Sequence, residues 1–136
     1  EKNKFSFGQW LGGYCSQTVI GSNARHDHNL LTAALVAPTK RFAMVRRIEE
    51  ILHVGSNAYR LDSQAMLHHQ MMLRDFVFLQ FFYDGLPSWE YMAEGVRVTK
   101  RLTLVYGTNS LAIQYQLHAD EAWMHGLRLF QCMVFI

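Results

Sequence analysis

Two histidines flank one aspartate in His26-Asp27-His28, the tripeptide with the clearest chemical character in the chain. Imidazoles two residues apart point to the same side of an extended segment, and this spacing suits two ligands of a zinc or iron ion. A complete site needs further ligands, and the spacing to the other histidines and carboxylates matches no established ligand pattern. A metal site at His26 and His28 is therefore one hypothesis, and a solvated polar loop is the simpler interpretation.

A second set of reactive side chains accompanies the apolar run at 76–83. A carboxylate in apolar surroundings has a raised pKa, and a partly buried imidazole can exchange a proton near neutral pH. His69, Asp75 and Tyr83 are the candidate acid–base groups, although a core histidine and a surface carboxylate would look the same in sequence. The residues that we expect to line an apolar ligand pocket beside them are Met71, Phe78, Phe82 and Tyr115.

Several kinds of site leave no trace in the sequence. There is no glycine-rich phosphate loop, no G-x-S-x-G elbow, no H-E-x-x-H and no C-x-x-C. The two cysteines, Cys15 and Cys132, are expected to be packed or reduced thiols, which slightly favours a reducing compartment such as the cytoplasm. No uninterrupted apolar window approaches the roughly 18 residues of a membrane-spanning helix, so no transmembrane span is predicted.

The composition is that of a single globular domain over residues 1–136. Half of the residues are hydrophobic and 18% are charged, which excludes a disordered chain. The net charge of +2 does not indicate a nucleic-acid-binding protein. Solvated faces account for the basic residues, and nucleic acid is only a lesser alternative partner. These basic residues are Lys40, Arg41, Arg46, Arg47, Arg97, Lys100 and Arg101.

Apolar spacing predicts helices in the first two thirds of the chain. A recurrence at three and four residues is typical of an amphipathic helix, here over 39–54. A second helix is expected over 62–83, with a buried strand as the alternative for its aromatic end at 76–83. A short third helix is expected over 88–95. The residues that set the first period are Phe42, Val45, Ile48 and Leu52.

Apolar and polar residues alternate in the last forty residues, which indicates half-buried strands. Two strands are predicted at 96–106 and 111–117, joined by a turn at 107–110, and a third at 127–136. Lys100 interrupts the apolar positions of the first of these strands, which we interpret as a sign of a sheet edge.

The predicted fold class is therefore α+β, with N-terminal helices packed on a C-terminal antiparallel β-meander in a cone-like or two-layer arrangement. This order and length resemble the cone-shaped domains of the nuclear transport factor 2 and ketosteroid isomerase type. The resemblance is one of architecture alone, and no functional residue is carried over from it.

An excess of large apolar side chains carries the functional prediction. Seven Met, nine Phe, six Tyr and three Trp exceed what a minimal core needs. We expect a non-catalytic interaction domain that binds a protein partner, or forms a homo-oligomer, through apolar surface. The alternative is a small enzyme, or a binder of a small apolar ligand, with a pocket between helices and sheet. No cofactor follows from the sequence.

Overall fold

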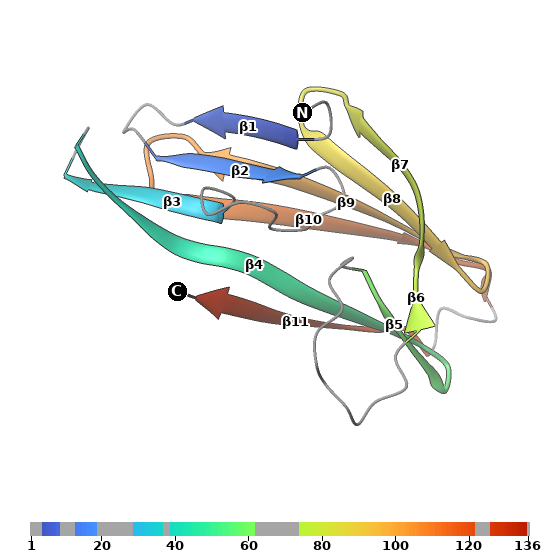
Figure 1. Ribbon diagram of the computed structural model, residues 1–136. Coiled ribbons are helices and arrows are strands. Elements are labelled where there is room, and N and C mark those ends of the chain that lie inside the picture. Colours follow the sequence, from blue (N-terminus) through green and yellow to red (C-terminus); the bar gives the residue numbers. More distant parts are fainter. Residues whose placement is uncertain are drawn as a thin grey trace. The chain divides into compact units, whose positions relative to one another are not determined.

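The computed structural model describes residues 4–8, 13–18, 29–36, 39–61, 74–121 and 126–135. In these ranges the chain forms β-strands and no helical element (Figure 1). The α+β prediction is therefore wrong, and with it the resemblance to cone-shaped α+β domains. No helix in the described ranges has the length and apolar character to cross a membrane.

Seven of the described strands form one sheet, in which the pairs of neighbours from β1 (Lys4–Gly8) to β5 (Asn57–Arg60) are antiparallel and β6 (Arg74–Asp75) is parallel to β5. A β-bulge interrupts the pairing of β3 with β4 between Leu31 and Thr32. The strands, in spatial order, are β1 (Lys4–Gly8), β2 (Tyr14–Thr18), β3 (Asn29–Val36), β4 (Lys40–Val54), β5 (Asn57–Arg60) and β6 (Arg74–Asp75), and β11 (Arg128–Phe135) pairs with β4.

A second sheet has four strands in the order β10-β9-β8-β7 and is antiparallel where the register is resolved. The strands expected at 96–106 and 111–117 are present as neighbours in it. The strand expected at 127–136 is also present, but as β11 it joins the first sheet, so the predicted three-stranded meander is wrong in that respect. The four strands are β7 (Val77–Tyr83), β8 (Pro87–Ala93), β9 (Val96–Val105) and β10 (Ser110–His118).

The helix predicted over 39–54 is instead the long strand β4. Its second half alternates between buried and half-buried positions from Ile48 to Val54, as in a strand with one face on the core. The residue at one of the buried positions is Glu50, a charged side chain. The charge of Glu50 made this alternation hard to recognise in the sequence, because a charged residue is normally expected on the solvent-exposed side of an element.

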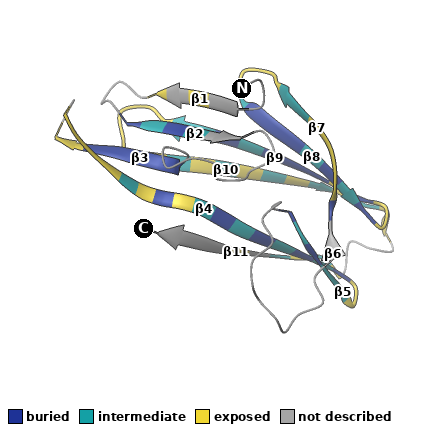
Figure 2. Cartoon of the chain, in the orientation of Figure 1, coloured by how far each residue is buried: buried dark blue, intermediate teal, exposed yellow. Residues whose placement is uncertain are grey.

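The other helix predictions fail in the same way. Residues 88–95 fall in β8 and the turn after it, where Trp89, Tyr91 and Ala93 are buried in alternation. The first part of the helix expected at 62–83 lies outside the described residues, and its end is strand β7. The alternative strand at 76–83 is thus correct in type, but β7 is largely exposed rather than buried (Figure 2).

Contacts divide the chain into two compact units. Unit 1 comprises residues 1–48, 102–113 and 133–136, and its described core includes Cys15, Leu30 and Ala33. Unit 2 comprises residues 49–101 and 114–132. Its described core is formed by Leu52, Val54, Trp89, Val96 and Val98.

Candidate functional site

A buried polar cluster lies inside unit 2 where the two sheets contribute side chains to the same core. Glu50, on β4, is 1% exposed. Its carboxylate interacts with two residues of the second sheet. The Lys100 Nζ atom lies 2.6 Å from Glu50 Oε1, and the hydroxyl of Tyr115 donates a hydrogen bond to the same oxygen. We refer to Glu50, Lys100 and Tyr115 as the Glu50 cluster.

Strand register explains how these side chains meet. Lys100 on β9 pairs with Trp89 on β8, so both side chains project from the same, inward face of the second sheet. Lys100 Nζ lies 5.7 Å from the centre of the Trp89 ring, close enough for a cation–π interaction. Lys100 therefore occupies an inward position on an inner strand, and its interpretation as an edge residue is wrong.

The environment of the cluster keeps the Tyr115 phenol protonated. Burial raises the pKa of Tyr115 far above its ordinary value, and the negative charge of Glu50 raises it further. A hydrogen bond with the Gln131 side chain opposes this shift but does not cancel it. Tyr115 is therefore a hydrogen-bond donor to Glu50 and not an acid–base group near neutral pH.

The Glu50 cluster has the chemistry of a structural contact. Two opposite charges removed from water are stabilised only if each has close partners, and here the carboxylate has both a cation and a hydroxyl donor. A solute has no direct access to a carboxylate that is 1% exposed. The cluster thus fixes β4 against β9 and β10 within unit 2.

The predicted metal and acid–base residues fall largely outside what the structure describes. His26, His28, His69 and Met71 lie outside the described residues. Asp75 is the last residue of the short strand β6, where it pairs with Arg60 in parallel register. Among the described residues, no three His, Cys, Asp or Glu side chains come together as metal ligands.

The predicted ligand-binding residues in the described ranges do not lie together on one face of the second sheet. Phe78 and Phe82 are both on β7, but they pair with Tyr91 and Ser88, which project from opposite faces of β8. Tyr83 ends the same strand and is 69% exposed. Tyr115 is part of the Glu50 cluster. The pocket was expected between helices and a sheet, and the described residues form no such helices.

Sequence reasoning missed the pairing of Glu50 with Lys100, although both residues leave a recognisable pattern. Each carries a charge at a position where an alternating strand has apolar residues two before and two after. These apolar neighbours are Ile48 and Leu52 around Glu50, and Val98 and Leu102 around Lys100. Two opposite charges at inward positions predict a buried ion pair, once both segments are assigned as strands.

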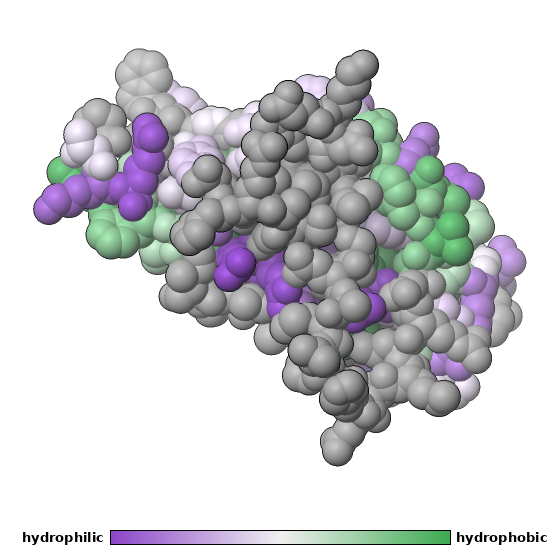
Figure 3. All heavy atoms as spheres, in the orientation of Figure 1, coloured by the Kyte–Doolittle hydropathy of each residue, from purple (hydrophilic) through white to green (hydrophobic). Residues whose placement is uncertain are grey.

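The most prominent exposed apolar side chains of unit 2 lie along β7. Val77, Phe78, Leu79 and Tyr83 are between 39% and 69% exposed, and we refer to these four residues as the β7 surface. Apolar atoms gather where this strand runs in the space-filling view (Figure 3). The strand also contributes to the core, because the rings of Phe78 and Phe81 contact Tyr91 and Trp89 edge to face.

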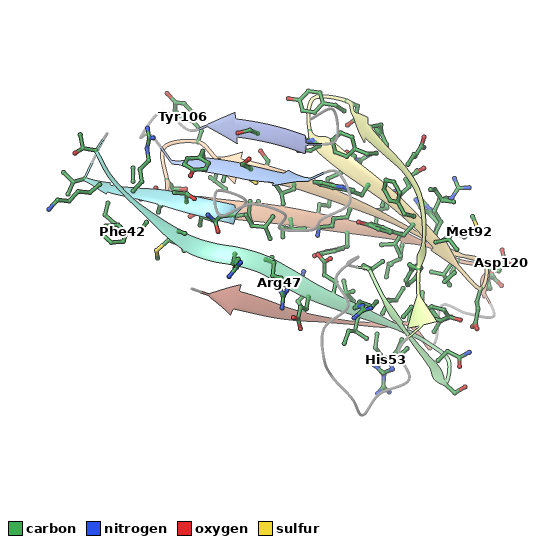
Figure 4. The ribbon with its side chains drawn as sticks, in the orientation of Figure 1. Phe42, Arg47, His53, Met92, Tyr106 and Asp120 are labelled. Carbon is green, nitrogen blue, oxygen red and sulfur yellow. The ribbon has the colours of Figure 1, made fainter. Side chains whose placement is uncertain are left out.

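Unit 1 carries a separate exposed set at the end of its β3–β4 and β9–β10 hairpins. Asn109 Nδ2 donates a hydrogen bond of 3.3 Å to the Ala34 carbonyl, which joins the two hairpins. Phe42 and Tyr106 both lie at this end of the unit (Figure 4). The exposed large apolar residues here are Leu35, Val36, Phe42, Met44, Val105 and Tyr106.

Over the residues that the structure describes, these features define a class: a β-protein with two sheets. A buried ion pair joins strands of both sheets inside unit 2, and several large apolar side chains are exposed. The chain belongs to the family described as glycogen debranching enzyme N terminal, whose model matches residues 8–134. No curated protein and no solved structure matches the chain.

Proposed function

We propose that this chain is a non-catalytic N-terminal module of a glycogen-debranching enzyme and that it binds the rest of that enzyme through the β7 surface. The proposal joins the family assignment to the exposed apolar side chains of unit 2. The observation that carries it is that β7 is the last described strand of its sheet and has exposed apolar side chains.

A sheet edge is normally protected from further pairing by charges, prolines or bulges. The β7 segment Val77–Tyr83 contains no charged residue and no proline, and its single bulge lies between Phe78 and Gln80. Three consecutive apolar residues at the start of the strand are exposed. Contiguous exposed apolar surface of this kind is typical of an interaction site.

The rest of the same polypeptide is the occupant that we favour. The family is named for the N-terminal part of an enzyme, so a module of this family is covalently linked to further chain. A covalent link makes the association intramolecular, and its high effective concentration allows even a modest apolar contact to remain closed. A second copy of the chain is the competing occupant.

An acid–base enzyme gains no comparable support from the described residues. Tyr83, one of its three proposed groups, is 69% exposed at the end of an edge strand, where its hydroxyl is open to water and not enclosed in a site. We therefore retain the interaction module as the proposed function.

Hydrogen exchange tests the proposal directly. The amides of Val77–Tyr83 should exchange more slowly in the full-length enzyme than in the 136-residue chain. Leu79→Lys in the full-length enzyme should abolish that difference, because it places a charge in the contact. Gln116→Lys, at an exposed position of β10, is the matched control and should preserve it.

Two results would contradict the proposal. Equal exchange of β7 in both proteins would mean that the rest of the enzyme does not cover this strand. Protection that appears in the isolated chain and increases with its concentration, together with a dimer in sedimentation, would assign β7 to a second copy instead.

A further inference from the structure

The charge of the chain is unevenly divided between the two units. Unit 1 contains seven Lys and Arg residues and two Asp and Glu residues, which gives it a formal net charge of +5. Unit 2 contains six and nine such residues, a net charge of −3, and the two values add to the +2 of the whole chain. A charge asymmetry of this size within a small protein indicates an anionic partner for the basic part.

The cations of unit 1 whose side chains the structure describes lie on the first half of β4. Lys40 and Arg41 are exposed beside the β3–β4 turn, and Arg46 and Arg47 follow on the same strand. The guanidinium carbon of Arg41 lies 6.0 Å from the centre of the Tyr14 ring, at the outer limit of a cation–π contact. No Asp or Glu is among the residues of unit 1 that the structure describes, so this described part has a uniformly positive sign.

Exposed apolar side chains lie at the same end of unit 1 as Lys40 and Arg41. Val36 pairs with Lys40, and Ala34 pairs with Arg41, across the β3–β4 hairpin. The β9–β10 turn lies beside this hairpin, because Asn109 donates a hydrogen bond to the Ala34 carbonyl. The ends of both hairpins therefore contribute to one part of the surface of unit 1.

We name this surface the hairpin end and define it as the six exposed large apolar residues of unit 1 together with Lys40 and Arg41. Among the apolar residues, Tyr106 is 81% exposed, Leu35 59% and Phe42 50%. Exposed apolar side chains gathered in this way are typical of an interaction site. The hairpin end differs from the β7 surface in charge, because strand β7 carries no charged residue.

Two properties of the hairpin end select its ligand. Its apolar side chains gain free energy in an apolar phase, and its cations gain it beside anions. A nucleic acid supplies phosphates, but it offers no apolar phase to aliphatic side chains such as Leu35 and Val36. The surface of an anionic bilayer supplies both, since acyl chains lie below a layer of negative headgroups. A bilayer also adapts to protruding side chains, whereas a folded protein partner needs a complementary surface.

We propose that the hairpin end of unit 1 binds the surface of an anionic lipid membrane. Leu35, Phe42 and Tyr106 enter the boundary between headgroups and acyl chains, and Lys40 and Arg41 contact the negative headgroups. Binding of this kind requires no membrane-spanning segment. The inference depends neither on the family assignment nor on the β7 surface, because its residues all belong to unit 1.

Co-sedimentation of the 136-residue chain with lipid vesicles tests the hairpin end. We expect binding to vesicles made of equal parts phosphatidylserine and phosphatidylcholine, and binding weaker by about tenfold or more to vesicles of phosphatidylcholine alone. Binding to the anionic vesicles should weaken as the salt concentration is raised, because salt screens exposed charges.

Two pairs of matched variants locate the contact. Arg41→Ser should weaken binding about fivefold, the loss expected for one cation near a membrane surface. Arg97→Ser removes an exposed cation of unit 2 and gives the same net charge, and it should leave binding within about twofold of the parent. Leu35→Ala should weaken binding about threefold, and Leu79→Ala on the β7 surface should not. All four residues are exposed, so these variants keep the fold.

The proposal is overturned if the chain does not sediment with the anionic vesicles, or if it binds neutral vesicles equally well. It is also overturned if Arg97→Ser weakens binding as much as Arg41→Ser. A loss of binding for Leu79→Ala but not for Leu35→Ala would assign the lipid contact to the β7 surface instead.

Two further polyanions distinguish a membrane from other anionic partners. Polyuridylate and polyglutamate should both bind more weakly than the anionic vesicles, because neither offers an apolar phase. Tighter binding of polyuridylate would overturn the proposal in favour of a nucleic acid. Tighter binding of polyglutamate would overturn it in favour of an acidic protein segment.

Discussion

Lys100 Nζ lies 2.6 Å from Glu50 Oε1 in the interior of unit 2, and these two residues come from different sheets. The pair is almost completely buried, and Tyr115 donates a hydrogen bond to the same carboxylate. A charge at such a position depends on its partner, because the interior solvates it poorly. The consequences for stability can be measured.

Glu50→Gln should destabilise the protein strongly, because it leaves the ammonium group of Lys100 buried without a counter-charge. Breaking one side of a buried pair costs about 3–5 kcal/mol. Urea unfolding followed by tryptophan fluorescence measures this loss. Glu121→Gln, at an exposed position, is the control and should change the unfolding free energy by less than about 0.5 kcal/mol.

A double variant separates the pair from its surroundings. Glu50→Leu/Lys100→Met removes both charges and should be less destabilised than either single variant, because no uncompensated charge remains. If the double variant loses the sum of the two single losses, the two charges do not interact and the cluster does not stabilise unit 2 as described.

The stability of the protein should fall above pH 10 in a way that depends on Tyr115. Its pKa is raised in the folded state from an ordinary value of 10.0, first by burial and then by the charge of Glu50. The unfolded chain therefore loses this proton first as pH rises, so the stabilisation is complete below pH 10 and declines above it.

The variant Tyr115→Phe isolates this effect from the other tyrosines. At pH 8 it should be less stable than the parent, because Glu50 loses a hydrogen-bond donor. The difference should shrink between pH 10 and pH 11.5, a range chosen to begin at the ordinary pKa. Guanidinium unfolding at several pH values measures it, and a difference that stays constant with pH would contradict the assignment.

Trp89→Ala should be among the most damaging substitutions in unit 2. Trp89 is 2% exposed. The centre of its ring lies 5.3 Å from the centre of the Phe81 ring, and Lys100 Nζ lies over the indole. Truncating a buried aromatic side chain typically costs about 3–5 kcal/mol. Thermal unfolding should show a large fall in the midpoint for Trp89→Ala and almost none for Tyr106→Ala, which removes a ring that is 81% exposed. Similar losses for both variants would contradict the assigned core.

Gly107→Ala tests the turn between β9 and β10. Gly107 has a φ of +73°, and a Cβ added there meets no atom within 4 Å. The cost is therefore conformational, about 1 kcal/mol, and not steric. Ser110→Ala, at an exposed position in the same hairpin, should be nearly neutral. Chemical denaturation of both variants gives the comparison, and a neutral Gly107→Ala would argue against the left-handed turn.

Local pattern was enough where each strand follows its neighbour in the chain. The segments 96–105 and 110–118 alternate between apolar and polar residues on either side of a glycine-containing turn, and they are strands β9 and β10. The same logic failed for β4, since its apolar residues fit both a helical and a strand period. The strand period was not recognised, because the charged residue Glu50 occupies one of its buried positions. In β8 the strand period was present, but Pro87-Ser88 also fits the start of a helix, and this start signal led to the helix prediction.

The sequence by itself determined the composition, the large supply of apolar side chains and the alternation of β9 and β10. Tertiary structure decided that β11 pairs with β4 and not with the meander, that β7 is an exposed edge, and that Glu50 meets Lys100. The physical reason is distance along the chain. Pairing across sheets depends on how distant segments share one core, and no window of neighbouring residues carries that information.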